Sequence, residues 1–577
     1  MLFSTLSSVT ALVSLASVAV GAPQTKAKCR YLPTDAGWPS TDRWNALNET
    51  VGGRLITGAP VGQVCYGSQP NNAACSMLAD DWNLVDPFIN QPVSVVAPYW
   101  DNNTCSPFVD ETVFNPISSC SLGNMASYAI NVSDARTVAA GVKFARQNNI
   151  RLVVKNTGHD YLGGSQGKGA LALWTHHLDD ITLVRNYTGK HYQGAAYKIG
   201  AGVQFRDLYA AAEKQGLRVV GGSCPTVGAN GGWRQGGGHG PLSSAYGMGA
   251  DNTLEFEVVT ADGSHIVASP SENSDLFYAL AGGGGGNYAI VVSAIVKAHA
   301  DGQVAGSRLT FNNDDDTTYW AAIEEWMRYL LVLDAIPGFA TDVLISSQSF
   351  SLTVATLPGG TVDSMNAALA PFYETLDRLK IVPVLNETAT QATYFEHYDH
   401  YIGGVEFTRN ITIGSRLIPR DLVRNGTLLP DLTAALRSIT STPGSVIYLL
   451  GYNVSDKRTG NPVGYNAVTR AWRDALFLIN LVIAGSSSDP WSAMAEQLAQ
   501  VNRWQDDLRE LTPGGGAYYN EGTYDTPFWK EDYFGGTYDK LLAVKEKYDP
   551  DHILWTRPTP GWTAYEQTSD GHLCKAS

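Results

Sequence analysis

The stretch from Gly221 to Gly240 reads GGSCPTVGANGGWRQGGGHG, and the rest of the chain is organised around it. Nine of its twenty residues are glycine. Glycine buries no side chain and loses more conformational entropy on folding than other residues, so this stretch cannot be a core helix or strand. Such backbone typically packs closely on a large planar or phosphorylated ligand, and Cys224 adds one thiol at that surface. A glycine-rich surface loop is the alternative interpretation.

A second glycine-rich turn lies upstream and reads NTGHDYLGGS over residues 156–165. It follows the apolar run Leu152 to Val154, which is typical of a short buried strand. A strand that ends in such a turn can aim backbone N–H groups at a pyrophosphate. His159 lies inside the turn. Taken alone, it is either a hydrogen-bonded structural histidine or a reactive one.

Together, the two stretches closely resemble the berberine-bridge-enzyme-like branch of the vanillyl-alcohol-oxidase flavoprotein family, in which a GGHD-like turn and a CPTVG motif hold FAD by two covalent bonds. The resemblance implies that His159 is bonded to the 8α-methyl group of the flavin and Cys224 to its C6 atom. It covers nearly the whole mature chain and includes Tyr518-Tyr519-Asn520 near the end. The other residues expected to contact FAD are Asn156, Thr157, Gly158, Asp160, Gly164, Ser165, Val227, Gly228, Gly232, Gly238, Ile290 and Val291.

The fold expected from this resemblance is α+β, with a two-part FAD-binding domain and a substrate domain whose antiparallel sheet roofs the flavin. The chain of 577 residues is long enough for more than one domain. We expect a signal peptide over 1–21, a disulfide-containing segment packed on the FAD domain over 22–119 and the FAD-binding domain over 120–303. The substrate-binding domain then covers 304–510, and 511–577 returns to the FAD domain. Within the FAD domain, Ser133 can cap a helix over 134–148.

The glycine run AGGGGGNYAIVV over 281–292 suggests a dinucleotide-binding fingerprint. The match is weak, because these glycines precede a strand-like run where the fingerprint needs them to open a helix. The resemblance instead places this run at the adenine end of FAD, where Ile290 and Val291 would lie.

The first 21 residues are small and apolar and end in Val18-Ala19-Val20-Gly21, as expected for a secretory signal. No Lys or Arg precedes the apolar run, so an uncleaved anchor is the alternative. No later stretch is a membrane-span candidate, since the run Leu476 to Ala484 is too short for a helix of about 20 residues.

The chain has seven cysteines, an odd number. If Cys224 is bonded to flavin, the other six can form three pairs, for which about 15 connectivities are possible. Proximity and the resemblance to similar fungal chains favour Cys65 with Cys75, Cys105 with Cys120, and Cys29 with Cys574.

Eight N-x-Ser/Thr sequons agree with a secreted, extracellular protein. They lie at Asn48, Asn102, Asn131, Asn186, Asn386, Asn410, Asn425 and Asn453.

The net charge of −15 and the low pI argue against nucleic acid as a partner, because its phosphates need a basic surface. The expected partners are a small-molecule substrate and dioxygen, with no stable membrane association and a monomeric state. No metal is expected either. His397 and His400 in FEHYDHY lack a third ligand and are interpreted as surface or hydrogen-bonding residues.

Oxidation by a flavin needs a fixed ring, a donor carbon close to it and a group that takes the accompanying proton. Tyr518 matches the family's Y-x-N tyrosine and is the expected proton acceptor, although its ordinary pKa of about 10 would have to be lowered. Glu521 and Tyr519 are alternative proton acceptors, and a purely packing role is the alternative for Tyr518. By the same resemblance, Asn520 lies beside the flavin. Val227 resembles the residue over the flavin face in oxidases, which predicts dioxygen as acceptor and hydrogen peroxide as product.

The sequence leaves several functions open. The first is a secreted FAD oxidase of an alcohol or related carbon of a small molecule or secondary metabolite. An oligosaccharide oxidase and a ring-forming catalyst on the same scaffold are alternatives within the enzyme class. A disulfide-linked extracellular binding glycoprotein without flavin is the alternative outside it. The colour of the purified protein separates the last from the others.

Overall fold

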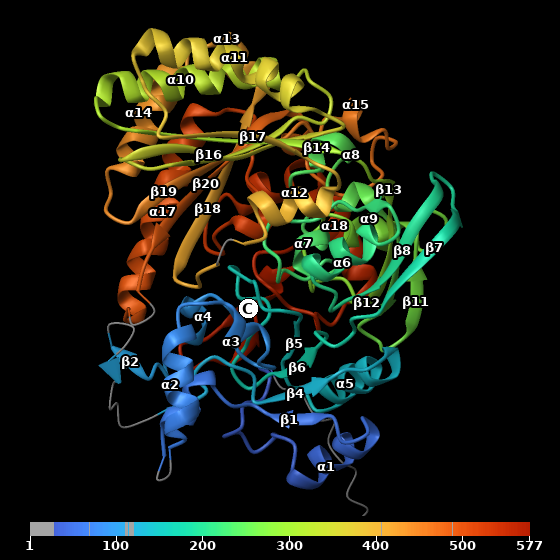
Figure 1. Ribbon diagram of the computed structural model, residues 1–577. Helices are drawn as coiled ribbons and strands as arrows, with labels where there is room; N and C mark the ends of the chain where they lie inside the picture. The colour runs from blue at the N-terminus through green and yellow to red at the C-terminus, as the bar shows by residue number, and fades with distance from the viewer. Residues whose placement is uncertain are drawn as a thin grey trace, which may run out of the picture.

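The computed structural model describes residues 28–67, 70–109, 113–114, 120–404, 407–486 and 489–576 (Figure 1). The expected signal peptide lies outside this range. Across the described residues, no helix combines the length and hydropathy that crossing a membrane requires. Helices and sheets are mixed and the larger sheets are antiparallel, so the expected α+β class is confirmed.

The first half of the FAD-binding part is a four-stranded sheet in the order β1-β4-β6-β5. Its strands are β1 (Leu55–Thr57), β4 (Tyr128–Asn131), β5 (Leu152–Lys155) and β6 (Leu171–Trp174). β4, β6 and β5 are parallel, and β1 pairs antiparallel at the edge. The N-terminal segment therefore adds a strand to this sheet, beyond the packing that the sequence predicts.

Helix α5 (Ala135–Gln147) packs on this sheet through Val138, Val142 and Ala145. It begins one residue later than the sequence predicts, because the cap is Asp134 and not Ser133. The Asp134 carboxylate accepts the backbone N–H of Thr137 at 2.9 Å in a capping box.

The second half is a five-stranded antiparallel sheet in the order β11-β10-β12-β8-β7. Its strands are β7 (Ile181–Thr188), β8 (Gln193–Gly200), β10 (Thr253–Val259), β11 (His265–Ala268) and β12 (Ile290–Lys297). Helix α6 (Phe205–Glu213) is followed by the short strand β9 (Leu217–Arg218) and then by the Cys224 stretch. The glycine run at 282–286 leads into β12, so it opens a strand and not a helix, as the sequence predicts.

The substrate part is a seven-stranded antiparallel sheet in the order β17-β14-β16-β15-β19-β20-β18. Its strands are β14 (Val304–Asn312), β15 (Ala340–Ile345), β16 (Ser349–Pro358), β17 (Leu385–Gln391), β18 (Ile411–Pro419), β19 (Ser445–Gly451) and β20 (Ala475–Ala484). β15 and β16 are consecutive in the chain and pair antiparallel. The apolar run at 476–484 lies in β20, buried between its neighbours in the sheet.

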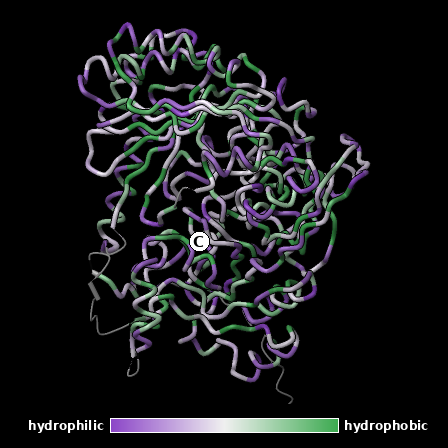
Figure 2. Tube along the Cα trace, viewed as in Figure 1, coloured by the Kyte–Doolittle hydropathy of each residue, from purple (hydrophilic) through white to green (hydrophobic). Residues whose placement is uncertain are grey.

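Helices cover the outer face of this sheet and leave its inner face toward the FAD-binding part (Figure 1). They are α10 (Asp316–Leu333), α11 (Val362–Leu379), α14 (Leu429–Thr440) and α17 (Trp491–Leu511). Apolar residues concentrate where these helices meet the strands, as the hydropathy colouring shows (Figure 2). Strand alternation divides the two faces, because Val343, Leu449 and Leu481 join the helix-side core while their neighbours point inward.

Three disulfides link the described chain. They are Cys29–Cys574, Cys65–Cys75 and Cys105–Cys120. Cys224 is the free cysteine of the described residues. The C-terminal residues return to the FAD-binding part, where helix α18 (Tyr538–Tyr548) contacts α9 (Ser274–Leu280).

The sequon side chains differ in exposure. Asn102, Asn186, Asn386 and Asn425 are exposed, and Asn48 and Asn131 are half-buried. Asn410 and Asn453 are buried, and their Nδ2 atoms donate to Asn83 Oδ1 at 2.7 Å and to the Asp334 carbonyl at 3.1 Å. Burial leaves little room for a glycan at Asn410 and Asn453, and glycosylation of the sequons stays a prediction.

Candidate functional site

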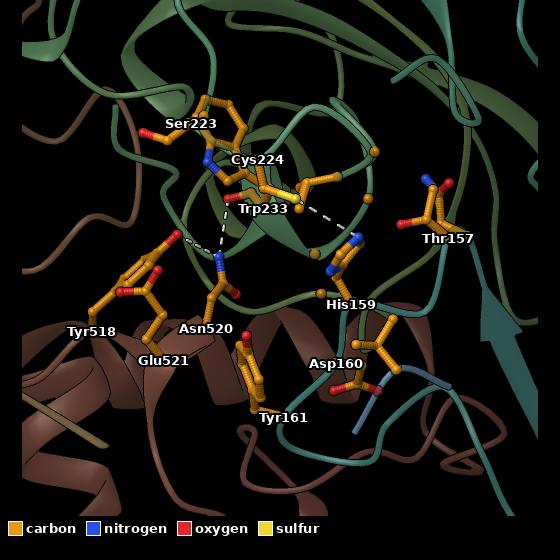
Figure 3. Close-up of a pocket in the computed structure, with 18 of the residues that line it drawn as sticks. Thr157, His159, Asp160, Tyr161, Ser223, Cys224, Trp233, Tyr518, Asn520 and Glu521 are labelled. Carbon is orange, nitrogen blue, oxygen red and sulfur yellow. Dashed lines mark hydrogen bonds between the residues drawn. The ribbon is translucent and has the colours of Figure 1, made fainter. Parts of the chain in front are cut away.

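A cavity of about 520 Å³ lies between the FAD-binding part and the inner face of the seven-stranded sheet. Both glycine-rich turns line it, and so do Tyr518, Asn520 and Glu521 from the C-terminal segment. Figure 3 shows the side chains of the turns facing those of the C-terminal segment across this space. Residues about 360 positions apart in the sequence therefore share one site.

The first turn begins where β5 ends and is held by Asp160. The carboxylate of Asp160 accepts backbone N–H groups of Leu162 at 3.0 Å, Gly163 at 3.0 Å and Ser165 at 2.6 Å. Gly158 has a φ of +88°, a conformation that favours glycine. These constraints fix His159 in the cavity wall.

The second turn packs against the first because glycine lets the backbones approach closely. A Cβ atom on Gly228 would lie 2.6 Å from Asn156 Nδ2, so no larger residue fits there without movement. Asn156 in turn donates to the Ala201 carbonyl. Cys224 and Val227 therefore face the cavity beside His159.

His159 and Cys224 meet across the two turns (Figure 3). The Cys224 Sγ atom lies 4.0 Å from His159 Nε2. Thr226 Oγ1 lies 2.8 Å from the same Nε2 atom and 3.6 Å from the sulfur. His159 Nε2 therefore has Thr226 as its hydrogen-bond partner, whereas no hydrogen bond to His159 Nδ1 is found among the described residues. One small ring system could reach both side chains.

The surroundings shift the pKa values of both groups. Burial lowers the pKa of His159 to about 4, with the positive charge of buried Lys155 adding to the effect. The imidazole is therefore neutral near pH 7. Burial raises the pKa of the Cys224 thiol, and hydrogen bonds from Thr226 and the backbone of Val227 oppose that shift.

Nearly all the residues expected to contact FAD line this cavity, and Gly238 is the exception. Gly238 has a φ of +73°, and a Cβ atom there would lie 2.6 Å from Trp233 Cδ2. Gly238 thus lets the chain turn beneath the Trp233 ring, and its expected contact with FAD stays a prediction.

On the opposite side of the cavity, Tyr518 and Glu521 form a polar group with their neighbours. Asn520 Nδ2 donates to Tyr518 Oη at 2.6 Å and to the Trp233 carbonyl at 3.1 Å. The Glu521 carboxylate accepts from Asn480 Nδ2 at 2.8 Å, and His239 Nε2 lies 3.3 Å from the same oxygen.

Burial raises the pKa of Tyr518 well above 10, and the negative charge of Glu521 raises it further. The lowered pKa that a proton-accepting Tyr518 requires is therefore absent, and this phenol stays protonated near neutrality. The pKa of Tyr519 is also raised well above 10 by burial, and its ring packs on Phe534. Both tyrosines thus lack the lowered pKa that a proton acceptor needs, and the identity of the proton acceptor stays a prediction.

Sequence reasoning missed four residues of this polar group: His239, Asp342, Tyr452 and Asn480. The Tyr452 hydroxyl donates to Asp342 Oδ1, and burial raises the pKa of Asp342 to about 6. Asp342 and Asn480 carry no local motif, since only strand pairing brings them to the cavity. His239 lies within the glycine-rich stretch 221–240, and this position is the one feature of the sequence that could have identified any of the four as a site residue.

The two histidines considered as metal ligands have other partners. His397 is buried and its Nε2 lies 2.9 Å from Thr356 Oγ1. His400 Nε2 lies 2.7 Å from Glu387 Oε1. Within the described ranges, no group of three or more His, Cys, Asp or Glu side chains is placed to hold a metal ion.

Comparison with known proteins agrees with this geometry. An FAD binding domain model matches residues 126–269, and a model described as berberine and berberine like matches 517–558. A VAO-type flavoprotein oxidase of Thermothelomyces thermophilus is 39% identical over 583 residues, covering 98% of this chain and 99% of the relative. The chain belongs to the VAO-type FAD-linked oxidoreductases.

Other relatives of this VAO-type enzyme extend the comparison. A bifunctional decalin synthase of Penicillium decumbens is 39% identical over 583 residues and covers 98% of each chain. The crystal structure of a VAO-type flavoprotein from Myceliophthora thermophila C1 superposes with a TM-score of 0.89 at 38% identity, covering 95% of this chain and 100% of that one. A chitooligosaccharide oxidase shares the fold alone, at 18% identity and a TM-score of 0.61.

The residues of this VAO-type enzyme fit FAD. The matched FAD region contains both glycine turns, and the berberine-like region contains Tyr518, Asn520 and Glu521. Close packing at Gly228 leaves bare backbone against the cavity. Asn156 Oδ1 is buried with no hydrogen-bond partner in the described part of the chain, so it can accept from a bound ligand.

Proposed function

We propose that this enzyme is a secreted oxidase that oxidises an alcohol or related carbon of a small molecule or secondary metabolite, using FAD bonded to both His159 and Cys224. For an alcohol, one alcohol and one dioxygen give one carbonyl compound and one hydrogen peroxide, so two electrons and two protons leave the alcohol and reach dioxygen. When bound, FAD supplies the ring that takes a hydride from carbon and passes two electrons to dioxygen. The observation that carries the proposal is the distance of 4.0 Å between Cys224 Sγ and His159 Nε2, which come from two separate glycine turns.

The two anchors differ in readiness to form a bond. His159 has a pKa of about 4, so its ring is neutral and nucleophilic at all physiological pH values. Its Nε2 atom is paired with Thr226, which leaves Nδ1 as the bonding nitrogen. Cys224 reacts as a thiolate, and its raised pKa makes that bond depend on pH.

We assign the proton-accepting role to Glu521. Its carboxylate is held by Asn480 at 2.8 Å and lines the cavity, so it can take the hydroxyl proton as the hydride leaves carbon. Tyr518, as a neutral phenol hydrogen-bonded to Asn520, positions the substrate oxygen beside it. Val227 faces the cavity from the CPTVG motif, and its small side chain supports dioxygen as the acceptor.

The extracellular location rests on the signal-like start, the three disulfides and the sequons at Asn48, Asn102, Asn131, Asn186, Asn386 and Asn425. We also propose that the enzyme is a monomer and that its domains begin at residues 120, 304 and 511. The seven-stranded sheet, which begins at Val304, supports the second of these boundaries.

A ring-forming catalyst is the second candidate, because a relative 39% identical over nearly its whole length is named a bifunctional decalin synthase. The same cavity would then fold a flexible substrate. Product analysis separates the two, since a cyclisation without oxidation consumes no dioxygen.

The test of the proposal begins with acid-denatured enzyme. We expect yellow colour to remain in the protein pellet of the wild type and of the single variants His159→Ala and Cys224→Ala. The double variant should release its flavin into the supernatant. Colour lost from the wild-type pellet contradicts covalent attachment. Oxygen uptake that matches peroxide formation one to one tests the acceptor.

A further inference from the structure

The inner face of the seven-stranded sheet divides the cavity into a polar corner and an apolar wall. Strand pairing sets this division, because it places Tyr448 of β19 opposite Asn480 of β20 and Asp342 of β15 opposite Leu450 of β19. Glu521 reaches the same corner from the C-terminal segment and binds Asn480. We call Asp342, Tyr452, Asn480, Glu521 and His239 the acid corner.

The acid corner presents hydrogen-bond acceptors and negative charge. Tyr452 occupies Oδ1 of Asp342, and no described group bonds its Oδ2 atom. Asn480 Oδ1 is buried and has no partner among the described residues. The charge of Glu521 also acts repulsively on Asp342, which is half-buried in this corner. A ligand that donates hydrogen bonds here satisfies groups that are otherwise unpaired.

His239 is the one basic side chain of the acid corner, and no Lys or Arg balances its two carboxylates. Of the described residues that line the cavity, none is Lys or Arg. Within the described ranges, neither Asp342 nor Glu521 has a Lys or Arg nitrogen within 4.0 Å, and His239 is the one ion-pair partner of Glu521. A carboxylate on the substrate would add a further negative charge to a poorly solvated space, at a high cost in free energy.

The wall beside the acid corner is aliphatic. It consists of Leu344, Val354, Ile411, Ile413 and Val482. Ile413 and Val482 are paired across β18 and β20, so this part of the wall is continuous. Such a surface favours an apolar body, whereas the many hydroxyl groups of a sugar would lose their hydrogen bonds to water without replacement.

We propose that the cavity binds a molecule with an apolar body and one hydrogen-bond-donating end without negative charge, either a hydroxyl group or a protonated amine. The donor end lies in the acid corner and the body lies along the aliphatic wall. Carboxylates and oligosaccharides are excluded. This inference rests on the proposed function, since it describes the substrate of the same site.

The experiment uses the flavin-loaded enzyme and four compounds: 3-phenylpropan-1-ol, 3-phenylpropylamine, 3-phenylpropanoate and cellobiose. Each is mixed with the enzyme without oxygen. For a compound that leaves the flavin oxidised, Kd is read from the change in flavin absorbance, and for one that reduces the flavin, Kd is read from the concentration dependence of the reduction rate. We expect the alcohol and the protonated amine to bind at least about 10-fold more tightly than the carboxylate. Burying the carboxylate charge is unfavourable, and each 1.4 kcal/mol of unfavourable free energy raises Kd about tenfold. Cellobiose should cause no change.

Asp342→Asn is the matching variant, because the amide keeps the shape of the side chain and removes its charge. The protonated amine should bind this variant about 10-fold more weakly, because it loses a charge pair and each 1.4 kcal/mol of lost binding free energy raises Kd about tenfold. The Kd of the alcohol should change less. Asp363→Asn, on the exposed start of helix α11, is the control and should alter no Kd.

Three results would overturn the inference: carboxylate binding as tight as that of the alcohol, cellobiose binding of similar strength, or no absorbance change with any of the four compounds. The comparison on unaltered enzyme is decisive even if Asp342→Asn does not fold. Failure of the proposed function has a different signature, which is flavin released by acid or no oxygen uptake with any bound alcohol.

Discussion

At the scale of single residues, the site depends on which group accepts the proton. Tyr518 is the natural choice from the motif, yet burial and the charge of Glu521 raise its pKa well above 10. We expect Glu521→Gln to slow flavin reduction by an alcohol by about 10²- to 10⁴-fold, the usual contribution of a general base. Tyr518→Phe should slow it less than about 10-fold. Anaerobic stopped-flow absorbance measures both, and the reverse order would return the role to Tyr518.

Asp342 gives a second prediction at this scale. Its folded-state pKa of about 6 lies above the ordinary value of 3.8, so the folded enzyme binds this proton more tightly than the unfolded chain. Stability from this group is therefore present below pH 3.8 and is lost as the pH rises to 6. Asp342→Asn buries no charge, so we expect it to be more stable at pH 7.5 by roughly 2 to 3 kcal/mol.

The measurement for Asp342→Asn is the Tm at pH 7.5 and at pH 4, with Tyr452, His239 and Glu521 unchanged as the titratable neighbours. The Tm gain at pH 7.5 should shrink toward zero at pH 4. A gain of equal size at both pH values would show that the ionisation of Asp342 is not its cause. Asp363→Asn should leave both Tm values unchanged.

At the scale of elements, the turn after β5 holds the first anchor through a glycine. Gly158 has a φ of +88°, and an added Cβ would lie 3.3 Å from the backbone of Ser94 and Val95. Gly359 has a φ of +78° with nothing within 4 Å, so it is a matched control. We expect both Gly→Ala variants to lose about 1 kcal/mol from backbone strain.

Only Gly158→Ala should also displace His159. In a Cys224→Ala background, where His159 is the one covalent anchor, we expect it to lower the covalently bound flavin in acid pellets at least several-fold. Gly359→Ala in the same background should keep its flavin. Equal retention by both would show that the turn tolerates a side chain.

At the scale of the whole molecule, one disulfide joins the two ends of the described chain. Cys29 and Cys574 are separated by 545 residues, whereas Cys65 and Cys75 are separated by 10. Chain-entropy arguments give about 6 kcal/mol for the long loop and about 3 kcal/mol for the short one. We expect Cys29→Ser/Cys574→Ser to lower the Tm more than Cys65→Ser/Cys75→Ser, with covalent flavin retained in both. Equal Tm losses would show that loop length does not decide stability here.

The sequence by itself determined the parts of this protein that depend on local chemistry. Glycine density at 221–240, the turn around His159 and the CPTVG motif sufficed for the family and for FAD, because these features are contiguous. The apolar run at 152–154 and the strand-like run after the glycines at 281–286 indicated strands, but these runs could not fix which strands pair.

Only the tertiary structure decided the chemistry around the flavin. The raised pKa of Tyr518 arises from burial by distant segments, so its motif could not reveal it. Asp342 and Asn480 meet Glu521 because antiparallel pairing aligns β15, β19 and β20 and turns alternate side chains inward. The packing of Gly238 against Trp233 and the burial of Asn410 and Asn453 also arise from segments that are distant in the sequence. Exposure and contact with a cavity are properties of the packed chain, and no residue carries them alone.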